Sequence, residues 1–319
     1  MSEATDQEII TKQQFEYYKF QVDFMMKEFM RKEEEIRATN QELREQRNDI
    51  FKQKQDLERK TQELQKVIED HDSSILYASY IQSVILGNQD SISDFFKELF
   101  ILYKPKGLVS GDFYWFHEID ENRGILAIGD CAGHGVPGAL MTTLNISLLN
   151  EIIIKEGERN PNFVLNHLDM RLTNALKGYN EMAAHDGLDI SILYYDKKLN
   201  VASISSTYQS SYHFRKNKLN RISGAKIKLG QDDPDRDKIF AETTFYVKPN
   251  DYLFFSTDGY INQLNMDEQK FGATHFEDLI LKGSELSLID HKEVFERELN
   301  EWKGSSAQSD DVLLVGIKI

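Results

Sequence analysis

The sequence is poor in the features that cross-link a chain or bind it to polyanions and membranes. Its single cysteine, Cys131, excludes an internal disulfide and any zinc site built from several cysteines. Its 38 basic side chains are outnumbered by 53 acidic ones, and the net charge of -15 argues against binding to the phosphate backbone of nucleic acids. No continuous apolar run approaches the ~18 residues that a membrane span needs, and the polar N-terminus does not resemble a signal peptide. We therefore expect a cytoplasmic protein that binds neither nucleic acid nor membrane.

The N-terminal part has the pattern of a coiled coil. The length of 319 residues leaves room for one large domain and such an accessory element. A strict seven-residue repeat indicates helices that supercoil with a left-handed twist. The repeat is formed by Phe15, Val22, Phe29, Ile36, Leu43, Ile50, Leu57 and Leu64.

The second core position of this repeat is poor, because either register places polar residues in the seam. If the second core position lies four residues after each heptad residue, it includes Glu33, Asn40 and Arg47. If it lies three residues after, it includes Lys32, Thr39 and Gln46. Such residues lower stability while restricting register and strand number. A lone helix over residues 15–71 would be roughly 85 Å long. We expect it to form a parallel homodimer, with packing on another protein or on the catalytic domain as the alternatives.

The pattern changes twice along the chain, which divides it into three parts. Residues 71–74 interrupt the heptads, and a second helical pattern over residues 75–85 ends at Gly87. We expect a coiled-coil dimerisation and signalling helix at 1–72, a regulatory linker helix at 73–98 and a catalytic domain at 99–319. In the last part, strands and helices occur in groups, which favours two packed antiparallel sheets covered by helices, an α+β fold. Strands are predicted at residues 100–104, 113–119, 125–128, 189–195, 201–206, 210–214, 243–247, 252–256 and 312–319, and helices at 137–154, 161–176, 276–281 and 290–302.

Four aspartates lie at strand ends, beside glycine or serine. Asp112 and Asp130 flank two strands within residues 107–138, Asp258 follows a third, and Asp310 precedes the last. One such aspartate is usually a turn residue, but four together weaken that explanation. Clustered carboxylates without cysteine or histidine at ligand spacing favour Mg²⁺ or Mn²⁺. Two such ions activate water for attack on phosphorus, and repulsion within the empty cluster predicts that metal also stabilises the fold.

Four segments resemble the motifs of one phosphatase family. They are residues 104–115, with Ser-Gly-Asp at 110–112; 130–139, beginning Asp-Cys-Ala-Gly; 257–259, Thr-Asp-Gly; and 308–311, Gln-Ser-Asp-Asp. In order and spacing they are similar to bacterial serine/threonine phosphatases of the sporulation stage II protein E type, a branch of the metal-dependent type 2C phosphatases. The resemblance covers residue 75 to the C-terminus. It implies an α-β-β-α sandwich and one-step hydrolysis of phosphoserine or phosphothreonine on a partner protein, typically an antagonist of an anti-sigma factor.

The resemblance also implies roles for individual residues. Asp130 would bridge two Mn²⁺ or Mg²⁺ ions, and the backbone carbonyl of Cys131 would bind one of them. Asp258 and Asp310 would hold the other, while Asp112 would bind metal directly or through water. Asp311 would support these ligands without binding metal itself.

The chain departs from the family pattern at three places. Eukaryotic relatives have a histidine two residues after the bridging aspartate, where this chain has Ala132, and we assign His134 a structural role rather than proton donation. Residues 205–209 replace a small Gly-Ala turn and are expected to border the substrate. Asp186 and Asp189 leave open a third, weaker metal site, although roles in a loop and at a strand edge are the simpler interpretation.

Other functions are less consistent with the sequence. The glycines at 133, 135 and 138 fit a dinucleotide fingerprint, but a second helix follows where that fold needs a strand. A cysteine phosphatase needs an arginine six residues after its nucleophile to bind the phosphate, and Pro137 stands there instead. The remaining alternative is a non-catalytic dimeric scaffold with a phosphatase-like domain. We expect no sensory domain before the coil, so that the input comes from an upstream signalling protein or from an unrecognised contact with the coil.

Overall fold

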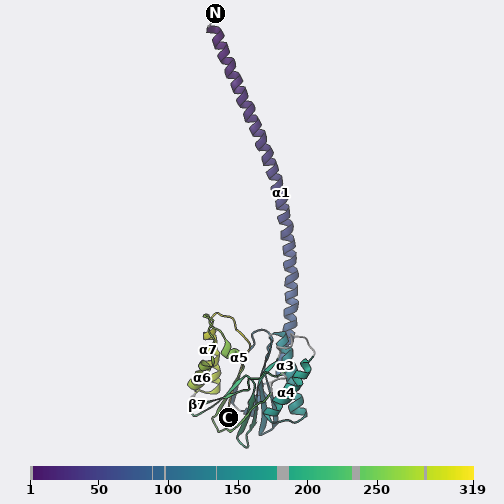
Figure 1. Ribbon diagram of the computed structural model, residues 1–319, viewed down its shortest axis with the longest axis vertical. Coiled ribbons are helices and arrows are strands. Elements are labelled where there is room, and N and C mark those ends of the chain that lie inside the picture. Colours follow the sequence, from purple (N-terminus) through teal and green to yellow (C-terminus); the bar gives the residue numbers. More distant parts are fainter. Residues whose placement is uncertain are drawn as a thin grey trace. The chain divides into compact units, whose positions relative to one another are not determined.

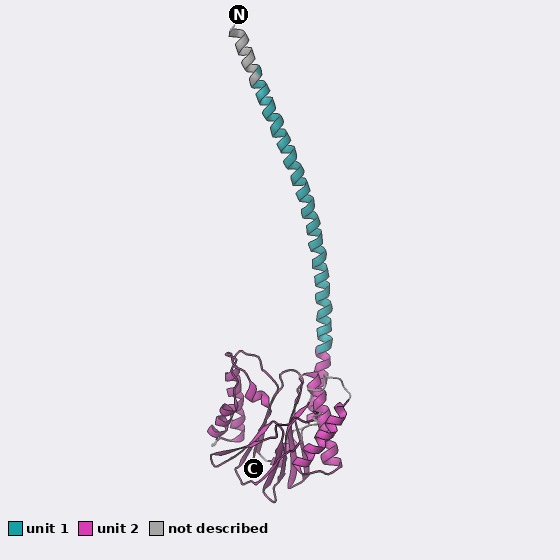
Figure 2. Ribbon diagram, in the orientation of Figure 1, with its two compact units in different colours: residues 1–71 teal, residues 72–319 magenta. Residues whose placement is uncertain are grey.

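A computed structural model describes residues 3–87, 89–96, 98–133, 135–177, 187–231, 238–283 and 286–319. The chain divides into two compact units, residues 1–71 and 72–319 (Figure 2). The first unit is helical and belongs to α1 (Glu3–Leu86). Helical structure includes residues 71–74, so residues 75–86 are the C-terminal end of α1 rather than a separate helix.

The heptad residues of α1 form an uncovered apolar row in the single chain. Phe15, Phe29, Ile50 and Leu64 are each more than 60 % exposed. The polar surface between them carries ion pairs of the i,i+4 type, such as Arg37 with Glu33, each of which contributes only about 0.2–0.5 kcal/mol. A helix of this composition gains stability mainly by burying its apolar row against a partner.

The second unit contains two five-stranded antiparallel sheets. The first, sheet A, has the order β1 (Glu98–Lys104), β10 (Val312–Lys318), β9 (Tyr252–Ser256), β6 (Ser210–Arg215) and β7 (Lys218–Ser223). The second, sheet B, has the order β2 (Asp112–Asp120), β3 (Arg123–Cys131), β4 (Leu188–Asp196), β5 (Val201–Ser206) and β8 (Glu242–Tyr246).

Helices cover the outer face of each sheet (Figure 1). Sheet B is covered by α3 (Val136–Leu149), the π-helical turn η1 (Asn150–Lys155) and α4 (Pro161–Leu176). Sheet A is covered by α6 (Ala273–Lys282) and α7 (Leu288–Lys303), with the short α5 (Asp258–Asn262) at one end of β9. The small α2 (Gln89–Phe96) packs into the layer between the sheets. The predicted α-β-β-α sandwich is thereby confirmed.

Alternation along the strands produces this layering. Successive side chains of a strand point to opposite faces, so Phe113 and Trp115 of β2 pack beneath α3 and α4, whereas Tyr114 packs between the sheets. Both faces of the first half of β2 are buried, and so are both faces of most of β3, with Ile125 outside and Leu126 inside. Burial on both faces explains why these strands read as continuous apolar runs.

One helical stretch among the described residues, Val136–Lys155, is long and apolar enough by composition to cross a membrane. It consists of α3 and η1, and its side chains Ile146, Leu149, Ile152 and Ile153 are buried against sheet B. Polar residues interrupt it, so no unbroken apolar run is visible in the sequence. Its buried face is that of a core helix, and its composition is weak support for a membrane span.

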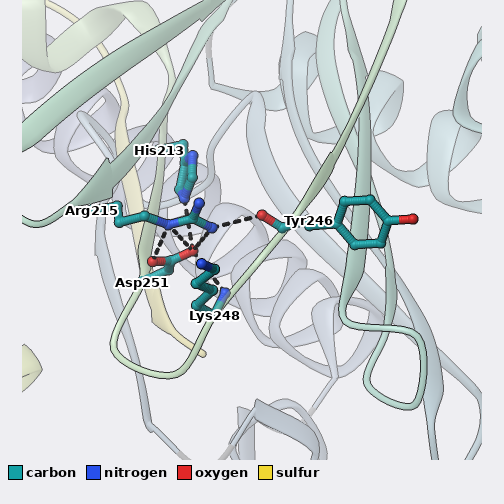
Figure 3. Close-up of polar contacts among 5 residues, drawn as sticks. All are labelled: His213, Arg215, Tyr246, Lys248 and Asp251. Atoms are coloured by element: carbon teal, nitrogen blue, oxygen red, sulfur yellow. Dashed lines mark hydrogen bonds and ion pairs between the residues drawn. The ribbon is translucent and has the colours of Figure 1, made fainter.

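A buried carboxylate ties three strands together at one end of the second unit (Figure 3). Asp251, 1 % exposed, accepts hydrogen bonds from Arg215 Nε at 2.7 Å and from the backbone nitrogen of Lys248 at 2.9 Å, and its Oδ2 lies 2.9 Å from His213 Nε2. Arg215 also donates to the carbonyl of Tyr246. Burial alone would raise the pKa of Asp251, but the hydrogen bonds from Arg215, His213 and Lys248 hold it below its ordinary value.

An Asp251→Asn variant is expected to lower the free energy of unfolding by about 2–3 kcal/mol at pH 7, because the replaced group accepts several charge-assisted hydrogen bonds. A lowered carboxyl pKa stabilises the fold above the unfolded pKa of about 4 and ceases to do so as pH falls through the folded pKa. The difference from wild type should therefore disappear in strong acid, as measured by urea denaturation at several pH values. Glu98→Gln, which removes an exposed partner of Lys318, is the control, with an expected cost below about 1 kcal/mol. An Asp251→Asn variant with the same free energy of unfolding as wild type would contradict this account.

Candidate active site

Strand register places three aspartates in one row across sheet B. Asp112 of β2 pairs with Asp130 of β3, and Asp130 pairs with Asp189 of β4. Directly opposed residues on antiparallel strands have Cβ atoms about 4.5–5.5 Å apart and lie on the same face. That face is the one between the sheets, because it also carries Tyr114, Ile128 and Leu193.

Sheet A contributes the other two predicted aspartates at the same end of the sandwich. Asp258 is the first residue of α5, directly after β9, and Asp310 precedes β10, which pairs with β9. A Cβ on Gly259 would lie 1.8 Å from the carbonyl oxygen of Asp311 and 3.3 Å from Cβ of Asp310. Only glycine permits this approach, which brings Asp258 next to Asp310.

Thr257 connects the two sheets at this point. Its hydroxyl donates to Asp112 Oδ2 at 2.7 Å and accepts from the backbone nitrogen of Leu313 at 3.0 Å. Thr257 is fully buried and Asp112 is 2 % exposed. The hydroxyl therefore fixes one oxygen of Asp112 and leaves the other available to a ligand.

Asp311 organises the glycine-containing loop before β2. Its Oδ1 accepts from the backbone nitrogen of Lys106 at 2.7 Å and its Oδ2 from that of Gly111 at 2.8 Å. A Cβ on Gly111 would lie 2.8 Å from the carbonyl oxygen of Cys131, and Cys131 N donates to Gly111 O at 3.2 Å. Asp311 thus positions the backbone that packs against the Cys131 carbonyl.

The thiol of Cys131 takes no part in the site. It is buried, and Asn145 Nδ2 lies 3.4 Å from its sulfur. Burial raises its pKa to about 12, so it stays protonated at neutral pH and is a poor nucleophile. The cysteine-phosphatase mechanism is excluded on this ground as well as by the sequence.

The carboxylates repel one another. Burial, followed by the charge of Asp130, raises the pKa of Asp112 well above its ordinary value. Burial and the charges of Asp258, Asp189 and Asp310 do the same for Asp130. Partial removal from water and the charge of Asp310 also raise the pKa of Asp258. Each of these carboxyl groups therefore holds its proton more strongly than a carboxyl group in water, and a nearby cation would favour its ionised form.

A cleft of about 260 Å³ opens above the cluster. Three of the carboxylates line it, those of Asp130, Asp189 and Asp258, together with Tyr208 and Arg221. The loop at 205–209, predicted to border the substrate, reaches the cleft through Tyr208 and Gln209. Asp112 lies buried beside the cleft, and Asp310 is exposed next to Asp258. His134 and Asp186 fall outside the described residues.

Comparisons with known proteins agree with this geometry. A family model for stage II sporulation protein E (SpoIIE) matches residues 120–319. The chain belongs to the SpoIIE family. Its second unit is therefore a serine/threonine phosphatase domain of the PP2C type. A comparison with curated proteins finds no significant match.

Solved structures resemble this SpoIIE-family chain over most of its length. The SiaA-PP2C domain of Pseudomonas aeruginosa is 26% identical with a TM-score of 0.71, and the match covers 79% of this chain and 98% of that one. Two further matches share the fold. The PP2C domain with part of the regulatory domain of SpoIIE from Bacillus subtilis is 19% identical, with a TM-score of 0.56 and coverage of 70% and 63%. The RsbU and RsbW domains of Rv1364c from Mycobacterium tuberculosis are 18% identical, with a TM-score of 0.55 and coverage of 69% and 59%.

The donor set of this SpoIIE-family domain fits a hard divalent cation, although its geometry is open. Within the described parts of the chain, no three His, Cys, Asp or Glu side chains already surround a position for an ion. The available donors are carboxylate and carbonyl oxygens, which Mg²⁺ and Mn²⁺ prefer. Burial and the charges of neighbouring carboxylates raise the pKa values of Asp112 and Asp130, and a bound cation would offset that repulsion.

The sequence analysis did not predict a role at the SpoIIE-type site for four residues. Thr257 stands inside a recognised motif, so its position was a usable signal. Gln82, Arg221 and Lys228 carry no local signal, because only tertiary structure brings them to the site.

Proposed function

We propose that this protein is a metal-dependent serine/threonine phosphatase that hydrolyses phosphoserine or phosphothreonine on a partner regulatory protein, such as an antagonist of an anti-sigma factor. The observation that carries the proposal is that Asp130 and Asp258, from different sheets, line one cleft beside the buried Asp112, with the carboxyl pKa raised at all three. Membership of the SpoIIE family supports the reaction class.

We assign the following roles in metal binding to the residues of the cluster. Asp130, at the centre of the row, would share its carboxylate between two Mn²⁺ or Mg²⁺ ions; Asp258 and Asp310 would bind one of them, and the Cys131 carbonyl the other. Asp112 would bind metal directly or through water, with Thr257 holding it in place. When bound, the ions would supply Lewis-acid activation of water for attack on phosphorus.

The rest of the cleft suits a phosphorylated side chain presented by a protein. Its volume of about 260 Å³ lies just below the ~300–1,000 Å³ typical of small-molecule pockets. Arg221 stands on the lining with its side chain 49% exposed, 3.6 Å from Glu277. A guanidinium binds phosphate oxygens well, so Arg221 would attract the substrate phosphate to the rim beside the carboxylates.

The proposal is tested by phosphate release from p-nitrophenyl phosphate and from a phosphoserine peptide, with Mn²⁺ and with Mg²⁺. We expect hydrolysis that a chelator abolishes. No hydrolysis with either ion would favour the alternative, a non-catalytic dimeric scaffold. The phosphoprotein itself would be sought by a pull-down with a metal-site variant.

Control would reach the site through the C-terminal end of α1. Gln82, only 6 % exposed, donates from Nε2 to the carbonyl of Ser110 at 2.6 Å, and its Oε1 accepts from the nitrogen of Ser110 at 3.0 Å. Ser110 Oγ in turn accepts from the backbone nitrogen of Asp112. A shift of this helical segment would therefore move the backbone that carries Asp112.

A Gln82→Leu variant is expected to lower turnover roughly tenfold, equivalent to about 1.4 kcal/mol, because it leaves both backbone groups of Ser110 without the amide. Phosphate release at several Mn²⁺ concentrations would measure it. The neighbouring Ser83→Ala change, at an exposed position, is the control and should leave turnover unchanged. Equal rates for all three proteins would rule out this route of control.

The apolar row of α1 would pair with a second copy as a parallel homodimer and receive an upstream signalling protein. Deletion of residues 1–72 is expected to give a monomer with altered turnover, since it removes the row and takes only Asp72 from the second unit. Light scattering measures the oligomeric state. A dimer that survives the deletion would show that the coil is not the contact. Cytoplasmic location, without binding to membrane or nucleic acid, is part of the same proposal.

A further inference from the structure

A lysine stands in line with the row of aspartates. Leu188 and Leu229 exchange backbone hydrogen bonds at 3.1 and 3.0 Å as an antiparallel bridge. This register puts residue 228 directly opposite Asp189. Lys228 therefore continues the row of Asp112, Asp130 and Asp189 across the sheet.

The side chain of Lys228 forms an ion pair with Asp189. Its Nζ lies 3.3 Å from Asp189 Oδ2, and the side chains are only 28% and 15% exposed. The lysine stem is packed so closely on Gly187 that a Cβ there would lie 2.6 Å from Lys228 Cγ. The other oxygen of Asp189 accepts from Thr207 Oγ1 at 3.4 Å. Both carboxylate oxygens thus have partners from the chain itself.

The ammonium also acts on the rest of the cluster. Burial alone would lower the pKa of Lys228, but the charges of Asp189, Asp130 and Asp258 raise it above its ordinary value. Lys228 consequently stays charged at neutral pH and partly neutralises the carboxylates.

We infer that Lys228 is a resident cation of the active site that takes the place of a third divalent ion at Asp189, so that the domain binds two ions. The inference rests on the proposed function, because it concerns the same metal cluster. It also resolves the question that Asp189 leaves open in the sequence: this carboxylate holds an ammonium and is not a metal ligand.

The test counts bound Mn²⁺ by equilibrium dialysis and records melting without metal, both on the full chain and without substrate. Wild type is expected to bind two ions. Lys228→Met keeps the packed stem but frees Asp189, so it should bind a third ion, and its metal-free Tm should fall by about 2–4 °C. Lys228→Met with Asp189→Asn should return to two ions and recover most of that Tm. Lys226→Met, at an exposed lysine two residues away, is the matched control and should change neither quantity.

The outcomes separate this inference from the proposed function. Three ions in wild type, or two in Lys228→Met, overturn the inference and leave a metal-dependent phosphatase standing. No Mn²⁺ bound by wild type overturns both. Asp189→Asn alone decides the matter if Lys228→Met does not fold: two ions support the inference, and loss of one shows that Asp189 is a ligand.

Discussion

Asp130→Asn is expected to lose phosphatase activity by a factor of about 10³ or more, since metal assistance contributes several kcal/mol and each 1.36 kcal/mol is tenfold in rate. Asp130 is opposed to a carboxylate on each side, Asp112 and Asp189, and it also interacts with Asp258. Asparagine keeps its shape but removes the charge that the ions would share. Phosphate release from p-nitrophenyl phosphate in Mn²⁺ measures the loss.

The melting temperature of the Asp130→Asn variant shows whether the loss of activity is due to misfolding. Because Asp130→Asn removes one of several repelling charges, its Tm without metal should equal or exceed that of wild type. Asp196→Asn, at the far end of the same sheet in a turn where Asp196 accepts from Leu199 N, controls for the chemistry of the substitution and should retain activity. Equal rates for Asp130→Asn and wild type would remove Asp130 from the mechanism.

Saturating Mn²⁺ is expected to raise Tm by about 5–10 °C at pH 7.5, since a ligand at 100 times its Kd adds about 2.7 kcal/mol. At pH 5 the rise should be much smaller. Burial and neighbouring charges raise the pKa values of Asp112 and Asp130, so both carboxyls hold protons more strongly than in the unfolded chain, and metal must displace those protons. Differential scanning calorimetry at both pH values measures the shift.

The same carboxyl groups determine how the stability of the metal-free protein changes with pH. A carboxyl whose folded pKa is raised binds its proton more tightly in the native state, so its contribution favours folding in acid and is lost as pH rises through the folded pKa. Asp251 has a lowered pKa and contributes in the opposite direction, so the two effects are best separated in the Asp251→Asn background. A Tm that neither Mn²⁺ nor Mg²⁺ moves at either pH would contradict the metal cluster.

Much of the fold could be predicted because its strands and outer helices bury apolar residues at regular spacing. The bounds of α4, β5 and β9 agree with the sequence prediction residue for residue. Three elements were not predicted, namely α2, β7 and α5. The helices α2 and α5 are short, and β7 is mostly exposed, so neither length nor periodicity marked them.

The candidate site could be predicted where aspartates lie at the ends of neighbouring strands. Asp112 and Asp130 were expected at adjacent strand ends, and the structure opposes them in register. The partners that hold the cluster were not predictable, because Lys228 lies in a segment without pattern and Gln82 looks like an ordinary helix residue. Their importance arises from contacts with residues that are distant in sequence, such as Ser110 for Gln82.

Anomalous scattering from a crystal grown with Mn²⁺ tests the central claim most directly. We predict two peaks within about 2.5 Å of carboxylate oxygens, with Asp130 shared between them and Asp258 and Asp310 on one side. Peaks elsewhere on the surface, or none in the cleft at saturating Mn²⁺, would contradict the account.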